Sequence, residues 1–135
     1  MPSNFLFNTR DLKFVLKEWL PLDQVLSYDL FSEAYSVDDV DMILEQAHKV
    51  SKEVIAPTNE EGDRHPAHLA DGKVELPASF KEAYKFVQEN GWGSSNLDLE
   101  GGAAMPQILQ TAVNELVCAA NPAFVPYVGA STASA

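Results

Sequence analysis

Apolar residues recur at every third or fourth position in several stretches of the chain, which is the spacing of the buried face of an α-helix. The first stretch can be capped by Asn8 or Thr9 and ends before Pro21. Its predicted buried face consists of Leu12, Val15, Leu16 and Trp19. Between residues 20 and 35 the apolar positions follow no single period, so we expect only a short helix or a packed connector there.

The clearest helix is predicted to begin after Ser36. Ser36 and Asp39 have the spacing of a capping box, with Asp in place of the usual Glu, and acidic residues in a first turn suit the positive end of the helix dipole. The predicted buried stripe consists of Val40, Ile43, Leu44, Ala47, Val50 and Val54. This helix is expected to end before Pro57.

The segment from Pro57 to Pro77 is rich in Gly, Pro, Asp, Glu and Asn, and its apolar residues show little periodicity. We expect a long surface loop without regular structure. Such a length is unusual inside a compact domain, so it indicates an excursion or a lid rather than a tight connection.

Two further helices are predicted in the second half of the chain. The first follows Pro77 and ends at Gly91, and its face consists of Phe80, Ala83, Tyr84 and Val87. The second follows Pro106 and ends at Asn121-Pro122, and its face consists of Leu109, Ala112, Val113, Leu116, Val117 and Ala120. A tight turn at Gly101-Gly102 lies in the loop between them. No stretch alternates like a β-strand, so the predicted fold class is all-α, a bundle of four to five helices.

The charge balance narrows the range of partners. Nine basic against twenty acidic residues give a formal net charge of −11, which repels phosphate backbones and anionic lipid head groups. We therefore expect no nucleic-acid partner, and no apolar run approaches the ~18 residues of a membrane span. The single cysteine, Cys118, permits no internal disulfide, and the first residues lack the pattern of a signal peptide, so a cytoplasmic protein is expected.

Few side chains in the sequence suit a catalytic or metal-binding role. His65 and His68, with Asp63, superficially suit a metal, but no second ligand pair exists, and a solvated loop is the favoured interpretation. Cys118 has no histidine nearby in the sequence and is predicted to pack in the core. Glu115 would be a general base only if desolvation raised its pKa, and a solvated carboxylate is the simpler interpretation. No catalytic, cofactor-binding or metal-binding residue is therefore assigned.

Several segments, taken in order, resemble acyl-CoA dehydrogenases. Residues 80–93 read FKEAYKFVQENGWG, which is similar to the family's helix ending in a Gly-aromatic step. A loop with Glu100-Gly101-Gly102 follows, then TAVNEL at residues 111–116, and then Asn121-Pro122-Ala123-Phe124. The family's loop usually reads Pro-Glu-Tyr-Gly-Gly, and this chain lacks the tyrosine. Residues 8–16, NTRDLKFVL, resemble the branch with an extended carboxyl terminus, which includes methylmercaptopropionyl-CoA dehydrogenase-like enzymes.

The resemblance implies the N-terminal helical domain of such an enzyme, with residues 1–35 as extension helices, 36–124 as the core bundle and 125–135 as the start of the next segment. In the family, a middle β-domain and a C-terminal helical domain hold FAD and the catalytic glutamate. The full-length enzyme, expected to be a homo-oligomer, desaturates an acyl-CoA substrate between its α and β carbons. We expect the chain alone to be inactive, to bind no flavin, and to supply one wall of the acyl pocket.

The segment after Asn121-Pro122 is the candidate for that wall. Phe124, Tyr127 and Val128 are predicted to contact the substrate if the prolines of this segment hold it off the bundle. The alternative is that these side chains fold back into the core. The chain ends in small residues without a helix cap, which favours a piece of a longer enzyme over the competing hypothesis, a stand-alone helical interaction module.

Overall fold

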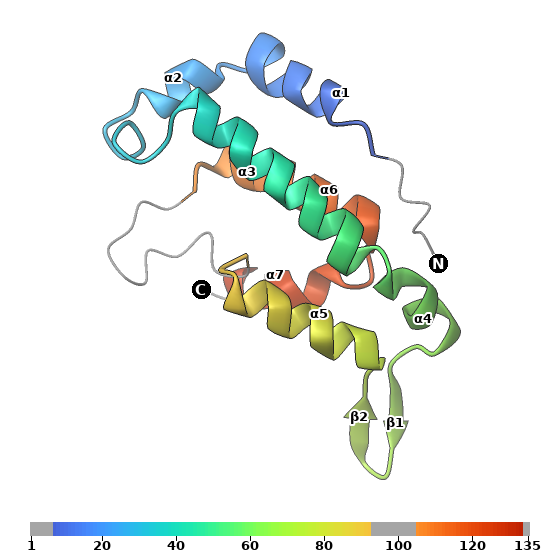
Figure 1. The fold of residues 1–135 in the computed structure, drawn as a ribbon. Coiled ribbons are helices and arrows are strands. Elements are labelled where there is room, and N and C mark those ends of the chain that lie inside the picture. The colour runs from blue at the N-terminus through green and yellow to red at the C-terminus, as the bar shows by residue number, and fades with distance from the viewer. Residues whose placement is uncertain (1–6, 93–104, 134–135) are drawn as a thin grey trace.

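A computed structural model describes residues 7–92 and 105–133, with the side chains of the last few of these excluded. The described residues form seven α-helices, two π-helical segments and one β-hairpin (Figure 1). In chain order these are α1 (Thr9–Phe14), η1 (Val15–Trp19), α2 (Leu22–Leu26), α3 (Val37–Val50), η2 (Ser51–Ile55), α4 (Thr58–Arg64), β1 (His68–Ala70), β2 (Lys73–Glu75), α5 (Ala78–Glu89), α6 (Gln107–Ala120) and α7 (Val125–Ala133). The predicted all-α class is confirmed.

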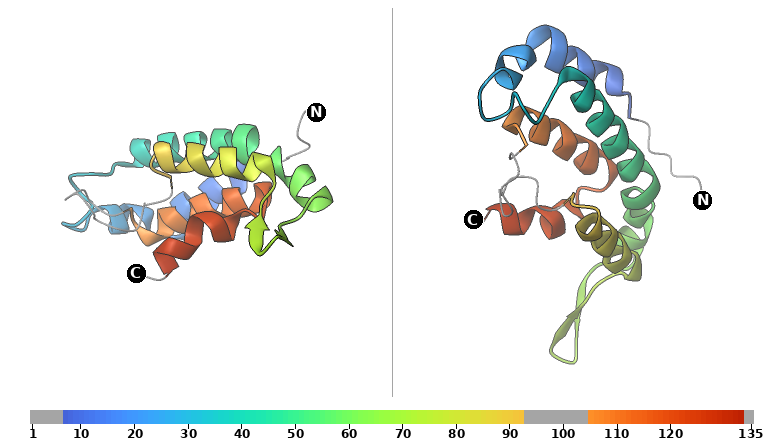
Figure 2. Two further views of the ribbon diagram at one scale, coloured as in Figure 1. Left: turned by 90° about the horizontal axis from the view of Figure 1, so that it is seen from below. Right: turned by 60° about the vertical axis from the view of Figure 1, so that its left-hand side comes forward.

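Six of the helices lie in three layers of two helices each. In the right-hand view of Figure 2, α1 and α2 form one side of the molecule, α3 and α6 form the middle, and α5 and α7 form the other side. Packing between α3 and α6 and between α5 and α7 agrees with this order. The hairpin of β1 and β2 projects from the end at which α4 meets α5 (Figure 1).

Two clusters of buried apolar side chains hold these layers together. The first cluster consists of Leu12, Leu16, Leu22, Leu26, Val40, Leu44, Ala47, Leu109, Ala112, Val113 and Leu116. The second consists of Ile55, Ala56, Phe80, Ala83, Val87, Ala120 and Phe124. Trp92 packs against both clusters. Both α3–η2 and α6 contribute to both clusters, so these two elements join the cores.

The predicted helix signals at Ser36 and Gly91 are confirmed. The Ser36 backbone N–H donates to Asp39 Oδ2 at 2.8 Å, and the Asp39 N–H donates to Ser36 Oγ at 3.2 Å, which is a reciprocal capping box. Gly91 has φ +75°, and the N–H of Trp92 reaches the carbonyl of Val87 at 3.0 Å. With the bond from the Gly91 N–H to the Gln88 carbonyl, this ends α5 in a Schellman motif.

Three positions expected on buried faces lie on the surface. Tyr84 is 42% exposed, because it lies at the edge of the α5 face formed by Phe80, Ala83 and Val87. Trp19 is 75% exposed, because η1 is π-helical and its wider turn rotates Trp19 away from the face of Leu12 and Leu16. Cys118, predicted to pack in the core, is exposed as well. It lies two residues beyond Leu116 on α6, so it faces away from the buried stripe.

The expectation of an unstructured loop between Pro57 and Pro77 was wrong. This segment contains α4 and the β1–β2 hairpin. The sequence gives no periodic signal for this helix, because α4 buries only Thr58 and has no apolar stripe. The strands have three residues each, too few to establish an alternating pattern. The signal that the sequence offered was Asp71-Gly72, the residue pair preferred in a two-residue hairpin turn.

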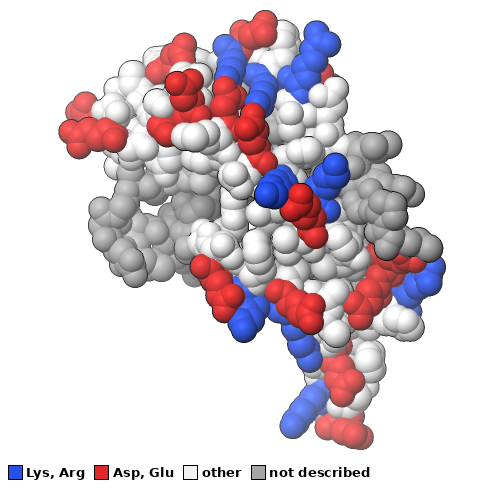
Figure 3. Space-filling model, viewed as in Figure 1, with Lys and Arg blue, Asp and Glu red and all other residues white. Residues whose placement is uncertain are grey.

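Charged side chains are mixed over the surface. On the face shown in Figure 3, Lys and Arg lie among Asp and Glu along the helices, without a broad basic patch. Within the described ranges, no helix is long and apolar enough to cross a membrane. The expected turn at Gly101-Gly102 lies outside the described residues.

Candidate functional site on helix α7

The start of α7 is attached to α5 by three aromatic rings. Phe80 contacts Phe124 edge-on, with ring centroids 5.6 Å apart, and contacts Tyr127 edge-on at 5.5 Å. The rings of Phe124 and Tyr127 are themselves 6.4 Å apart and tilted by 31°. Edge-to-face pairs add an electrostatic attraction of about 0.5–1.5 kcal/mol to the burial of their apolar surface. This aromatic cluster (Phe80, Phe124, Tyr127) therefore fixes the first turn of α7.

The other side of Phe80 lies against the backbone of α4. A Cβ placed on Gly62 would come within 2.7 Å of the Phe80 ring, so only glycine permits this approach. Next to it, the Ser79 N–H donates to Glu61 Oε2 at 3.1 Å, and hydrogen bonds from Ser79 hold the pKa of Glu61 below its ordinary value. Helix α4 thus packs against Phe80 and supports the aromatic cluster.

A buried chain of hydrogen bonds joins the end of α6 to the first residue of α4 and to the last residue of η2. Asn121, which is fully buried, donates through Nδ2 to Thr58 Oγ1 at 2.8 Å, and Thr58 Oγ1 donates to the Ile55 carbonyl at 2.6 Å. The amide oxygen of Asn121 accepts the N–H of Ala123 at 3.0 Å. Asn121 therefore sets the direction in which the chain leaves α6 and enters α7. Sequence reasoning recognised Asn121 only as a helix terminator.

The predicted substrate-contacting residues occupy different environments. Phe124 is 0% exposed and belongs to the second core cluster, whereas Tyr127 is 37% exposed and Val128 is partly buried against the same cluster. The segment thus folds back onto the bundle, and the expectation that its prolines hold it away does not match the structure. Phe124 anchors α7, and Tyr127 keeps part of its ring on the outer surface. Contact with a substrate stays a prediction for all three residues.

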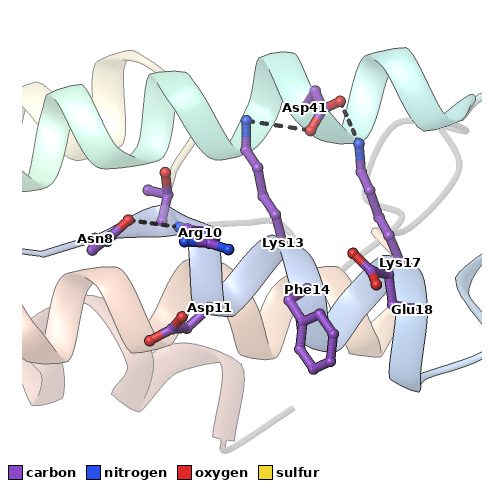
Figure 4. Close-up of a pocket in the computed structure, with 9 residues that line it drawn as sticks. Asn8, Arg10, Asp11, Lys13, Phe14, Lys17, Glu18 and Asp41 are labelled. Atoms are coloured by element: carbon purple, nitrogen blue, oxygen red, sulfur yellow. Dashed lines mark hydrogen bonds and ion pairs between the residues drawn. The ribbon is translucent and has the colours of Figure 1, made fainter.

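A second candidate is the hollow between α1–η1 and α3 (Figure 4). Lys13 on α1 and Lys17 on η1 both reach Asp41 on α3, and Lys13 also lies 3.5 Å from Glu45. The hydrogen bond from Lys17 is the main reason that the pKa of Asp41 is lowered, and it outweighs the opposing effect of burial. The hollow is lined by three basic and three acidic side chains, so it offers no net positive charge to an anion.

The remaining sequence candidates stay apart in space or on the surface. His68 pairs with Glu75 across the hairpin, with 3.6 Å between Nε2 and Oε2, and both side chains are more than half exposed. Among the described residues, no group of three His, Cys, Asp or Glu side chains could hold a metal ion. Glu115 is exposed on α6, as the simpler interpretation of it required.

Comparison with known proteins gives a consistent family assignment. No protein-family model matches the chain. Over 128 residues, or 93% of its length, the chain is 33% identical to a butyryl-CoA dehydrogenase of Syntrophomonas wolfei. It is 34% identical over 131 residues to the broad-specificity linear acyl-CoA dehydrogenase FadE5 of Mycobacterium tuberculosis, and 33% identical over 116 residues to the 3-methylmercaptopropionyl-CoA dehydrogenase of Ruegeria pomeroyi.

The chain is a homologue of the acyl-CoA dehydrogenases. The matched regions cover 94% and 85% of the chain for FadE5 and the Ruegeria enzyme, but only 20–21% of each of the three relatives. This acyl-CoA dehydrogenase homologue therefore spans about a fifth of the length of the curated relatives it matches. That extent agrees with the N-terminal helical domain expected from the sequence.

Proposed function

We propose that this chain is the N-terminal helical domain of an FAD-dependent acyl-CoA dehydrogenase, and that the outer face of α7 forms one wall of its acyl pocket. The observation that carries the proposal is the contrast between Phe124, which directly precedes α7, and Tyr127 in the first turn of α7. Phe124 is fully buried in the core, while Tyr127 contacts Phe80 and Phe124 and still presents part of its ring outward. A rigidly held, partly apolar surface suits an alkyl chain, which offers no polar group for recognition.

The flavin is assigned in this proposal to parts of a full-length protein outside this chain. A flavin dinucleotide carries a diphosphate, which needs basic groups or convergent backbone N–H donors. Here Lys13, Lys17 and Lys85 each lie against a carboxylate, and the chain as a whole is strongly acidic. These pairings and the acidic charge support a flavin site outside the described residues. A middle β-domain and a C-terminal helical domain would supply it, together with the catalytic base.

The homologues support this proposal over the stand-alone interaction module, because all three relatives are named as dehydrogenases. The chain purified alone should be colourless. A stoichiometric flavin absorbance band in the isolated chain would contradict the assignment of the flavin to other domains.

The pocket-wall role is tested in the full-length enzyme by Tyr127→Ala. A methylene in an apolar pocket is worth only ~1 to 3 kcal/mol, so removal of the ring should change relative kcat/KM among acyl-chain lengths and leave the chemical step nearly unchanged. Phe124 is unsuitable for this test, since it is fully buried and its loss would damage the fold.

The matched control is Tyr28→Ala, which removes the same kind of ring from a position that is 52% exposed near the other end of the molecule. Tyr28→Ala should leave both the length profile and the flavin content unchanged. If Tyr127→Ala also leaves the length profile unchanged in a folded, flavin-loaded enzyme, α7 does not line the acyl pocket.

A further inference from the structure

The β1–β2 hairpin carries an exposed apolar pair. Leu69 on β1 and Val74 on β2 lie directly opposite each other, and they are 73% and 69% exposed. Figure 1 and the right-hand view of Figure 2 show the hairpin projecting away from the helices. Exposed strand edges present unpaired backbone groups and are usually blunted or covered.

The geometry of the turn determines which backbone groups face outward. Asp71 and Gly72 both have positive φ, +49° and +75°, as in a type I′ turn. In such a two-residue hairpin the residues that flank the turn, Ala70 and Lys73, form a hydrogen-bonded pair, and the next pair does not bond internally. The N–H and C=O of Val74 therefore point away from β1, and those of Leu69 point away from β2.

The charges along β2 are self-complementary. The strand reads Lys73-Val74-Glu75, with an apolar residue between opposite charges. If a second copy of β2 pairs antiparallel with the first about a two-fold axis at Val74, each Lys73 lies opposite the other copy's Glu75. The two Val74 residues then form a hydrogen-bonded pair and exchange both backbone bonds. Strand β1 reads His68-Leu69-Ala70 and has no such charge pattern.

We propose that β2 is a self-association edge, which pairs antiparallel with β2 of a second copy of this chain and forms a four-stranded sheet. The proposed partner is a second copy of this chain, because the two-fold arrangement pairs the outward N–H and C=O of Val74. The same arrangement also places each Lys73 opposite a Glu75. Such a contact is isologous, as in most symmetric dimers. The apolar side chains of Val74 and Leu69 from both copies then lie side by side on one face of the sheet.

Strands of only three residues bury little surface, far below the ~1,200–2,000 Å² of a stable interface. The isolated chain should therefore form a weak dimer in rapid exchange with the monomer. Sedimentation velocity over a range of concentrations should show a rising average mass. Amide signals of residues 73–75 should shift with concentration in NMR spectra of the same samples.

The sharpest test replaces one outward N–H with proline. Val74→Pro removes the donor that the proposed dimer uses, whereas Leu69→Pro removes the equivalent donor from the opposite edge, and both alter the same apolar pair. Val74→Pro should abolish the association and Leu69→Pro should retain it, with contacts between Ala70 and Lys73 preserved in both. A monomeric wild-type chain, or an equal effect of the two prolines, would overturn the proposal.

A charge exchange provides a second test that leaves the backbone intact. Lys73→Glu places like charges opposite each other twice in the dimer and should weaken it by roughly 2- to 30-fold. The double variant Lys73→Glu/Glu75→Lys restores opposite pairs and should recover the wild-type dissociation constant. If the double variant associates no better than Lys73→Glu, the two-fold axis at Val74 is refuted.

Discussion

The chain attaches its first and its last described helices to the bundle in different ways. Leu12 and Leu16 bury one side of α1–η1, and beside them Lys13 and Lys17 reach across to Asp41. Helix α7 is instead attached through the aromatic cluster, whose centre is fully buried. The attachment of α1–η1 depends partly on ion pairs, so added salt and low pH should weaken it. The attachment of α7 depends on the packing of apolar rings.

The aromatic attachment should give the largest effect when it is broken. Phe124→Ala removes a fully buried ring and should reduce the free energy of unfolding by about 3–5 kcal/mol. Tyr127→Ala in the isolated chain is the control, because its ring is partly exposed and its loss should cost clearly less. Urea unfolding followed by circular dichroism measures both. Equal losses would mean that Phe124 does not anchor α7 more firmly than Tyr127.

The close approach of Phe80 to α4 should be the next most sensitive feature. Gly62→Ala places a methyl group 2.7 Å from the ring of Phe80, which is itself buried, so we expect a loss of about 1–3 kcal/mol. Gly129→Ala is the matched control, since it also lies in a helix but a Cβ there meets nothing within 4 Å. That variant should gain up to ~1 kcal/mol from helix propensity. Thermal unfolding of the two variants should therefore move in opposite directions.

The ionic attachment should give the smallest effect. Asp41→Asn removes the partner of both lysines, and since these side chains are about 30% exposed we expect a loss of only about 1 kcal/mol. The loss should shrink further in high salt, because added ions screen the pairs. Glu45→Gln, at a carboxylate that is 70% exposed, is the control and should change the unfolding free energy less.

The wild-type chain and the Asp41→Asn variant should also differ in how their stability depends on pH. Because the folded state lowers the pKa of Asp41, its stabilisation is fully present above the carboxyl's ordinary value of 3.8 and is lost as the pH falls through the lowered value. The difference in unfolding free energy between wild type and Asp41→Asn should therefore be constant at neutral pH and vanish in acid. A difference that grows as the pH falls would contradict the assigned ion pairs.

The sequence predicted the features that depend on local pattern. The capping box at Ser36, the end of α5 at Gly91 and the buried stripe of α6 all follow from residue type and spacing within one or two turns. Each element agrees with its own local preferences, so no tertiary information was needed.

Features that depend on contacts between distant residues could not be predicted in this way. The proximity of Gly62 to Phe80 and the bond between Asn121 and Thr58 join residues that no periodicity relates. The environment of Phe124 depends on where α5 lies, which the segment after Asn121 does not encode. The turn at Asp71-Gly72 is different, because the preference of this residue pair for a hairpin turn is local to the sequence.

The π-helical turn η2 has a consequence for changes in chain length. Upstream of it, Val40, Leu44 and Ala47 enter the first cluster, and its own last residue, Ile55, enters the second. A π turn holds one residue more than an α turn, so the five residues of η2 rotate the chain by about as much as four residues of an α-helix. Deleting one residue within 51–55 would therefore restore a regular α-helix and leave the residues that follow in nearly the same orientation. The same deletion within α3 would instead rotate all that follows by roughly 100°, so the helix formed by α3 and η2 should tolerate a deletion at its π turn and lose the alignment of its two core faces after a deletion upstream.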